Sequence, residues 1–180
     1  LQEKLQCHNI NFVSPTHFVP QIVMAIAEAI PMGLRIPLVY NTNAYDSPEI
    51  IKLLNGIVDI YLPDLRYAAD IWARKYSRAP EYVFYSRTVI KEMHRQVGEL
   101  VIDKDGIARR GLIVRHLVLP HDIAGSGPTL KWLASELSTS VSISVMAQYN
   151  PAHLAKRVPR LARPITKKEY DDVVLLVDEL

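Results

Sequence analysis

Apolar segments of strand length alternate with segments of helical periodicity along almost the whole chain of 180 residues. Strands are predicted at residues 10–13, 36–40, 57–62, 112–119 and 141–146. Between them, apolar residues recur at intervals of three and four, which predicts intervening helices. Strands and helices in alternation indicate right-handed βαβ units and a parallel sheet, and nearly continuous apolar strands fit burial on both faces. The sequence therefore predicts an α/β fold in one domain, residues 1–180.

Local signals add detail to this outline. Asp105-Gly106, between two apolar runs, predicts a small hairpin at residues 100–107. Thr166 followed by Glu169 forms a capping box, which predicts a helix to the end of the chain. Residues 151–164, basic and rich in proline, are predicted to be irregular. The buried stripe of the longest predicted helix consists of Val89, Ile90, Met93 and Val97.

Two architectures fit the alternation: a full or partial β/α barrel, and an open doubly wound sheet. The first predicted strand leads into Ser14–His17 and not into a glycine-rich phosphate-binding turn. The dinucleotide-binding form of the doubly wound sheet therefore has no positive support.

Composition narrows the class of protein. Apolar residues make up 49% of the chain and charged residues 22%, and the net charge is +2, which gives no argument for nucleic acid or an anionic membrane as partner. No apolar run reaches the roughly 20 residues that a bilayer requires, and residues 1–6 do not form a signal peptide. Cys7 is alone, so we expect a reducing cytoplasm. Because the chain opens on what looks like the tail of an amphipathic helix, we expect it to be a fragment.

Every predicted strand is followed by polar residues on its carboxyl side. In parallel α/β folds these ends converge on one rim, where binding sites are built. The rim then combines amide, hydroxyl, imidazole and paired charged groups, which suit a polar zwitterion carrying a sugar and a base. In chain order the clusters are Ser14–His17, Asn41–Asn43, Asp64 with Arg66, Arg115-His116 with His121, and Gln148–Asn150.

Each cluster also has a structural interpretation. Asn41–Asn43 are typical of loop residues that bond their own backbone. Asp64 and Arg66 form either a structural ion pair or a ligand clamp. Arg115 lies inside an apolar strand, where an unpaired charge is costly, and this favours a functional role. His116 points to the opposite face, as a satisfied core histidine would.

Other chemistries have weaker support in the sequence. His17, His116, His121 and His153 lack a recognised metal-ligand spacing, so no metal site is predicted from protein ligands alone. No serine or cysteine lies beside a base as in a nucleophile elbow, and the acid pair of a glycosidase is absent.

Read as longer segments, the strand ends resemble the radical S-adenosylmethionine proteins of the pyruvate formate-lyase activating-enzyme family. The resemblance covers nearly the whole chain in order. The matching segments are residues 9–17 (NINFVSPTH), 39–43 (VYNTN), 58–66 (VDIYLPDLR), 90–98 (IKEMHRQVG), 111–120 (GLIVRHLVLP) and 146–149 (MAQY).

This resemblance implies a partial (β/α)6 TIM-type barrel with a [4Fe–4S] cluster at its top. Three cysteines spaced Cys-x-x-x-Cys-x-x-Cys bind three irons, and S-adenosylmethionine binds the fourth. One-electron reduction, from a donor such as flavodoxin or ferredoxin, releases a 5′-deoxyadenosyl radical that takes hydrogen from a glycine of a partner enzyme. A cluster needs three thiolates, so the resemblance implies that the first strand and the cluster loop are missing from this chain.

The resemblance also assigns roles to residues at the strand ends. It implies that Asp64 and Arg66, the counterpart of an Asp-Leu-Lys sequence, lie beside cofactor and substrate glycine as catalytic residues. Arg66 replaces the family's lysine, and His121 stands where the family has glycine. The residues implied to bind S-adenosylmethionine are Pro15, Thr16 and His17 near the methionyl amine, Asn41, Thr42 and Asn43 in the turn beside it, Arg115 at the ribose and carboxylate, and Gln148 and Tyr149 at the adenosyl group.

Three hypotheses follow. The first is a radical S-adenosylmethionine enzyme that makes a radical on a protein or a small substrate, for which the family name implies a glycyl-radical enzyme. The second is a non-catalytic homologue that binds a nucleotide-like ligand or a partner protein through the same rim. The third is a β/α-barrel lyase or hydrolase that uses Asp64, Arg115 and the histidines with a divalent metal.

Overall fold

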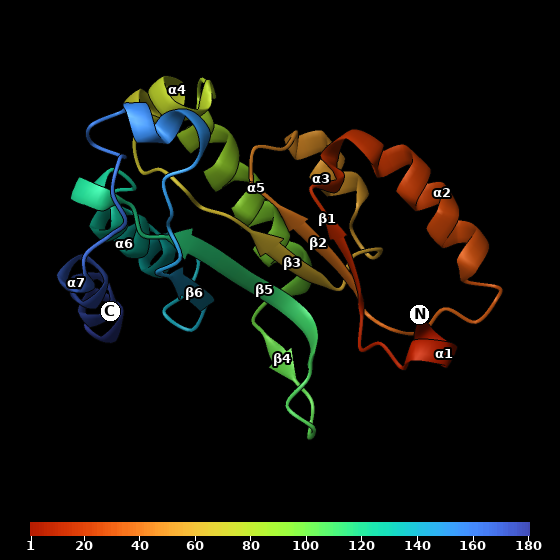
Figure 1. The fold of residues 1–180 in the computed structure, drawn as a ribbon. Helices are drawn as coiled ribbons and strands as arrows, with labels where there is room; N and C mark the ends of the chain where they lie inside the picture. Colours follow the sequence, from red (N-terminus) through yellow and green to blue (C-terminus); the bar gives the residue numbers. More distant parts are fainter.

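Six strands form one sheet in the computed structural model, which describes residues 1–180 (Figure 1). All neighbouring pairs are parallel except β4–β5, and the parallel strands follow the order β1-β2-β3-β5-β6. β1 and β6 each pair on one side only, so the sheet is open. The α/β fold with a parallel sheet is confirmed, whereas closure into a barrel is not. The strands are β1 (Ile10–Val13), β2 (Leu38–Thr42), β3 (Ile60–Pro63), β4 (Val101–Ile102), β5 (Ala108–Leu117) and β6 (Ser142–Met146).

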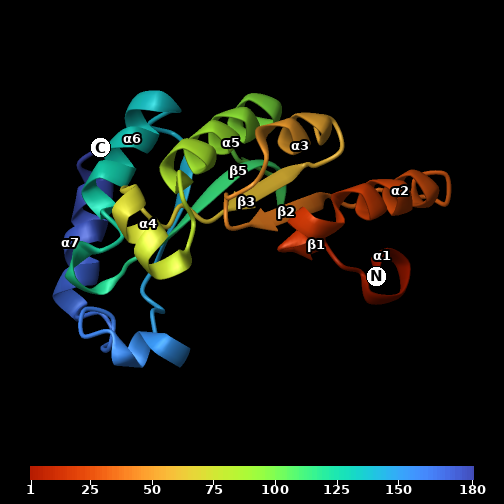
Figure 2. The same cartoon turned by 90° about the horizontal axis from the view of Figure 1, so that it is seen from above.

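Helices connect the parallel strands, and α3 and α5 run along the same face of the sheet (Figure 2). At the other end of the sheet, α6 packs against α7. The α-helices are α1 (Gln2–Leu5), α2 (Val19–Ala29), α3 (Pro48–Leu53), α4 (Asp70–Ser77), α5 (Tyr82–Val97), α6 (Ser126–Glu136) and α7 (Lys167–Asp178). Short 3-10 helices are η1 (Pro15–Phe18), η2 (Pro120–Asp122) and η3 (His153–Arg157).

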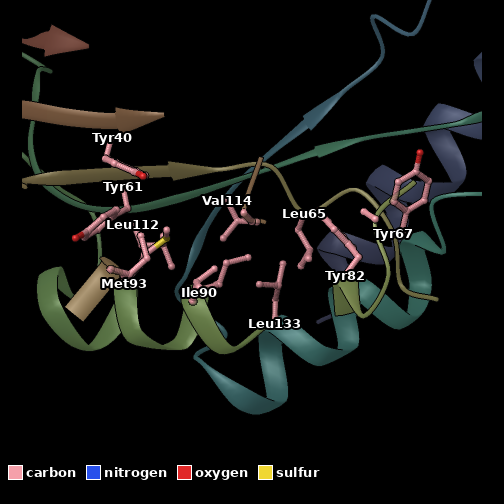
Figure 3. Close-up of a cluster of buried hydrophobic side chains, with 14 of the residues drawn as sticks. Tyr40, Tyr61, Leu65, Tyr67, Tyr82, Ile90, Met93, Leu112, Val114 and Leu133 are labelled. Carbon is pink, nitrogen blue, oxygen red and sulfur yellow. The ribbon is translucent and has the colours of Figure 1, made fainter. Parts of the chain in front are cut away.

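The main core lies between α5 and the sheet, where the predicted stripe of α5 is buried with 0–6% exposure. Tyr61 of β3 and Leu112 and Val114 of β5 face it and are fully buried (Figure 3). Full burial of a side chain of this size stabilises the fold by about 1.5–3 kcal/mol. This core packs β3 and β5 against the same helix, so the carboxyl ends of the two strands keep a fixed position relative to each other.

Two strands start two or three residues later in the sequence than predicted. β2 runs over Leu38–Thr42 instead of 36–40, and β3 over Ile60–Pro63 instead of 57–62. At the start of both strands, Asp59 Oδ2 accepts from the backbone N of Leu38 at 2.8 Å, while Val58 N still bonds back to Leu54 O. The shift matters because Asn41 and Thr42 then belong to a buried strand and not to a loop.

The predicted hairpin is present, but its second arm is the start of β5. β4 pairs with Ala108 and Arg110 across a turn in which Gly106 has φ 77°, and the arm projects from the sheet (Figure 1). β5 therefore begins at Ala108, four residues before the predicted strand. Gly111 is required where the two segments cross, because a Cβ there would lie 2.5 Å from Glu99 O.

The C-terminal predictions hold in part. The capping box is confirmed, since Thr166 Oγ1 accepts from Glu169 N at 3.1 Å and Glu169 Oε2 accepts from Thr166 N at 2.7 Å. Residues 151–164, predicted to be irregular, contain the single short helix η3. α4 was not predicted. None of the helices combines the length and apolar character needed to cross a bilayer.

Candidate functional site on the strand rim

A charged network joins the carboxyl ends of β2, β3 and β5. Arg115 donates from Nε to Asp64 Oδ1 at 2.6 Å and from Nη2 to Asn41 Oδ1 at 3.0 Å. Arg66 donates from Nη2 to the other oxygen, Asp64 Oδ2, at 2.9 Å. One carboxylate therefore orders two guanidinium groups, and the cluster keeps an excess positive charge suited to an anionic ligand group.

The backbone holds this network in register. Asp64 N donates to Thr42 O at 2.8 Å and Leu65 N to Arg115 O at 2.9 Å, which continues the sheet one step past β3. The Asp64 side chain is 10% exposed, whereas those of Arg115 and Arg66 are 27% and 48% exposed. The carboxylate is thus fixed and buried, while both cations remain accessible from solvent.

A second carboxylate, Asp46, lies beneath the ends of β1 and β2. Its Oδ1 accepts from Thr16 Oγ1 at 2.6 Å and Tyr40 OH at 3.0 Å, and its Oδ2 accepts from Thr42 Oγ1 at 2.5 Å. Asp46 is 2% exposed and forms no salt bridge. Burial, followed by the charge of Asp46, raises the pKa of Tyr40, so the hydroxyl stays protonated as a donor.

Tyr82, at the start of α5, connects the turns that follow β2 and β3. Its hydroxyl accepts from Arg66 N at 2.9 Å and lies 2.9 Å from Asp64 O and 3.3 Å from Asn43 O, to which it donates. Tyr82 is 3% exposed, and burial raises its pKa. The first turn of α5 therefore fixes the backbone on which Asp64 and Arg66 stand.

The predicted site residues separate into groups. Asn41, Asp64, Arg66 and Arg115 come together in the charged network. Thr16 and Thr42 instead meet at Asp46. The others have individual surroundings: Pro15 is buried, His17 is exposed, Asn43 Oδ1 accepts from Tyr45 N, Gln148 is exposed, and Tyr149 OH donates to Leu161 O.

The structural interpretation of Asn41–Asn43 holds for Asn43, whereas the side chain of Asn41 makes a different contact. Asn43 bonds its own loop, with Oδ1 3.0 Å from Tyr45 N, as the structural interpretation predicts. The side chain of Asn41 instead reaches across the sheet to Arg115. The sequence pattern alone could not separate them, because the partner of Asn41 is 74 positions away in the sequence.

His116 is a satisfied core histidine, as its position in the strand predicted. It is fully buried, with Nδ1 2.7 Å from Leu65 O and Nε2 2.9 Å from Ser126 Oγ. The carbonyl can only accept, so Nδ1 carries the proton and Nε2 accepts from Ser126. Burial lowers the pKa of His116.

Sequence reasoning missed Asp46 and Tyr82. Asp46 precedes the Ser-Pro start of α3 and has the sequence context of an ordinary loop residue. Tyr82 is the first residue of α5 and precedes the predicted stripe, which begins at Val89. The hydrogen-bond partners of Tyr82 lie 16 to 39 positions away in the sequence, and those of Asp46 lie 4 to 30 positions away.

Metal-binding side chains do not gather in this chain. No group of three or more His, Cys, Asp or Glu side chains is placed to hold a metal ion. Cys7 is the single cysteine, so residues 1–180 do not fit a [4Fe–4S] cluster, which needs three thiolates.

Comparisons with known proteins give the fold a context. No family model matches the chain. It is 28% identical over 174 residues to uncharacterized protein MJ0674 of Methanocaldococcus jannaschii, a match covering 95% of this chain and 46% of that protein. The chain thus spans about half the length of the curated relative it matches.

A solved structure gives the clearer comparison. The crystal structure of a domain of pyruvate-formate lyase-activating enzyme from Bacteroides vulgatus matches with a TM-score of 0.60, covering 95% of this chain and 92% of that one. The two chains have this fold in common. Their sequence identity is 12%, so the match shows the fold alone.

Proposed function

We propose that this chain is the S-adenosylmethionine-binding body of a radical enzyme of the pyruvate formate-lyase activating-enzyme kind. The observation that carries the proposal is the charged network of Asp64, Arg66, Arg115 and Asn41 on the carboxyl rim of a sheet whose fold matches an activating-enzyme domain. Sites in parallel α/β folds are built on this rim. We further propose that residues 1–180 form one domain of a cytoplasmic protein.

S-adenosylmethionine presents a carboxylate, an amine, a ribose and an adenine. Arg115 and Arg66 are accessible guanidinium groups whose orientation is already set by Asp64, so they suit the carboxylate and the ribose hydroxyls. We assign the turn Pro15–His17 to the amine and Gln148 with Tyr149 to the adenosyl group. We place Asn41–Asn43 in a turn near the cofactor. Ordering the cations before binding reduces the entropy lost when the ligand binds.

The cluster of such an enzyme supplies the electron that cleaves the sulfonium. Residues 1–180 do not fit it, so the proposal requires that sequence outside this chain carry the three cysteines. The match to less than half of the archaeal relative leaves room for that sequence. The proposed partners are a flavodoxin or ferredoxin as electron donor and a glycyl-radical enzyme as hydrogen donor.

The first experiment uses the protein with its natural flanking sequence, reconstituted anaerobically with iron and sulfide, reduced, and mixed with S-adenosylmethionine. We expect 5′-deoxyadenosine, measured by chromatography, to form only with both cluster and reductant. Arg115→Ala should reduce its formation, whereas Arg35→Ala, an exposed arginine remote from the network, should not. A protein with an intact cluster that yields no 5′-deoxyadenosine would overturn the proposal.

A second candidate is a non-catalytic homologue that binds a nucleotide-like ligand or a partner through the same rim. One observation favours it: the chain has a single cysteine. Calorimetric titration of residues 1–180 with S-adenosylmethionine tests the binding that both candidates require. Binding that Arg115→Ala weakens, from a protein whose natural flanks hold no cluster, would select this second candidate.

A further inference from the structure

Two stretches at the carboxyl end of the sheet carry a group of basic residues without acidic partners. They are α4 and residues 153–160, which lie at the same end of the molecule (Figure 1). Asp70 is the one acidic residue in the two stretches, and its Oδ1 is engaged by Val83 N at 2.8 Å. The basic residues, all exposed and none in a salt bridge, are Arg74, Lys75, Lys156, Arg157 and Arg160.

The two stretches meet at one aromatic pair. Trp72 and Tyr76 stack with a 5.7 Å centroid distance and a 5° interplanar angle. The Arg160 guanidinium lies 5.2 Å from the Trp72 centroid, and Lys75 Nζ lies 5.8 Å from the same ring and 5.5 Å from Tyr76. Two cations therefore converge on one aromatic pair, where the rings attract each of them. No carboxylate relieves their mutual repulsion.

This surface also has exposed apolar side chains. Ile71 of α4 and Leu154 of η3 are 66% and 54% exposed. Apolar side chains among unpaired cations are the composition of a docking face that a complementary acidic surface covers.

We propose that α4 and residues 153–160 form a docking surface for a protein partner that presents carboxylates around an apolar contact. The proposal is independent of the radical chemistry proposed above, since it needs only this surface. A single-stranded nucleic acid fits less well, because bases stack on free aromatic faces and Trp72 is already covered by Tyr76 and Arg160. A membrane surface fits less well, since an interfacial helix needs a broad apolar face and the eight-residue α4 exposes Ile71 as its one large aliphatic side chain.

The test measures binding of residues 1–180 to three labelled probes at several salt concentrations. The probes are a glutamate-rich peptide with two central leucines, a single-stranded DNA oligonucleotide, and vesicles of phosphatidylserine and phosphatidylcholine. We expect the peptide to bind best, with an affinity that falls as salt rises. The double variant Lys75→Glu/Arg160→Glu should weaken peptide binding by about tenfold.

A matched control separates this surface from overall charge. Lys104→Glu/Lys131→Glu makes the same change in net charge at exposed, unpaired lysines on the hairpin turn and on α6, and should alter binding less than about twofold. If Lys75→Glu/Arg160→Glu does not fold, Arg74→Glu/Arg157→Glu tests the same face without touching the aromatic pair. Equal losses in test and control variants, no peptide binding, or tighter binding to the DNA or the vesicles would overturn the proposal.

Discussion

The rim contains two buried carboxylates that the fold satisfies in opposite ways. Asp64 is paired with two guanidinium groups that solvent can reach, whereas Asp46 accepts from three hydroxyl groups and forms no salt bridge. The hydroxyl groups satisfy the buried oxygens of Asp46 but bring no positive charge that would attract an anionic ligand group. Accessible cations can instead add an anionic partner. We therefore regard Asp64 as part of the candidate site and Asp46 as the support beneath it.

The largest expected effect on stability is at Asp46, the buried carboxylate that accepts from hydroxyl groups alone. Asp46→Ala removes the acceptor of Thr16, Tyr40 and Thr42, and should lower the free energy of unfolding by about 3 kcal/mol because buried hydroxyls lose their partner. Urea denaturation measures this change. Asp46→Asn, which keeps one acceptor oxygen, should cost less. If Asp46→Ala costs under about 1 kcal/mol, the hydroxyl groups find other acceptors and the support role is wrong.

A substitution in the charged network of Asp64, Arg66 and Arg115 should cause a smaller loss of stability and a clear loss of ligand binding. Arg115→Met leaves Asp64 with Arg66 alone, and should cost about 2 kcal/mol, less than a fully buried pair that loses its one partner. Under the proposed function, its affinity for S-adenosylmethionine should fall about tenfold, measured by calorimetry.

The same strand offers a control for Arg115→Met. Arg109 also lies in β5 and pairs with an aspartate, Asp103, but it is exposed. Arg109→Met should cost less than about 1 kcal/mol and leave ligand affinity unchanged. Equal effects of the two substitutions on binding would remove the distinction between the rim and an ordinary surface pair.

His116 follows Arg115 in β5 and points into the core. Like Asp46, it is a buried polar group whose partners lie within the protein. Its folded pKa is lowered from 6.5 by burial, so the unfolded chain takes up the proton first. Stability is therefore complete above about pH 6.5 and declines as pH falls below it, by at most about 1.4 kcal/mol per pH unit. Denaturation across pH 5–8 measures the slope, and His116→Gln should flatten it while the exposed variant His153→Gln should not.

The smallest effect is expected at the link between the two turns. Tyr82→Phe removes the hydroxyl that contacts Asn43, Asp64 and Arg66, and should cost about 1 kcal/mol. Tyr85→Phe, on the same helix and without a hydrogen bond at its hydroxyl, serves as the control in thermal unfolding. If ligand affinity falls with Tyr82→Phe and stays constant with Tyr85→Phe, the first turn of α5 positions Asp64 and Arg66 for the ligand.

Prediction from sequence succeeded where the signal is local and failed where a distant partner decides. The stripe of α5 and the capping box at Thr166 depend on residues three or four positions apart, and both are confirmed. The start of β2 was predicted two residues too early, and in the structure it lies where Leu38 N donates to Asp59, 21 positions away. The barrel stays unconfirmed, since the strands of this chain do not close.

The sequence by itself determined the α/β class, the alternation of strands with helices, and the polar character of the strand ends, because periodicity and capping act between near neighbours. Only the tertiary structure decided which polar residues meet. Asp64 and Asn41 accept hydrogen bonds from Arg115, which is 51 and 74 positions away in the sequence. Asp46 accepts one from Thr16, 30 positions away. Such contacts depend on strand order and register, which bring together residues that carry no sign of one another in the sequence.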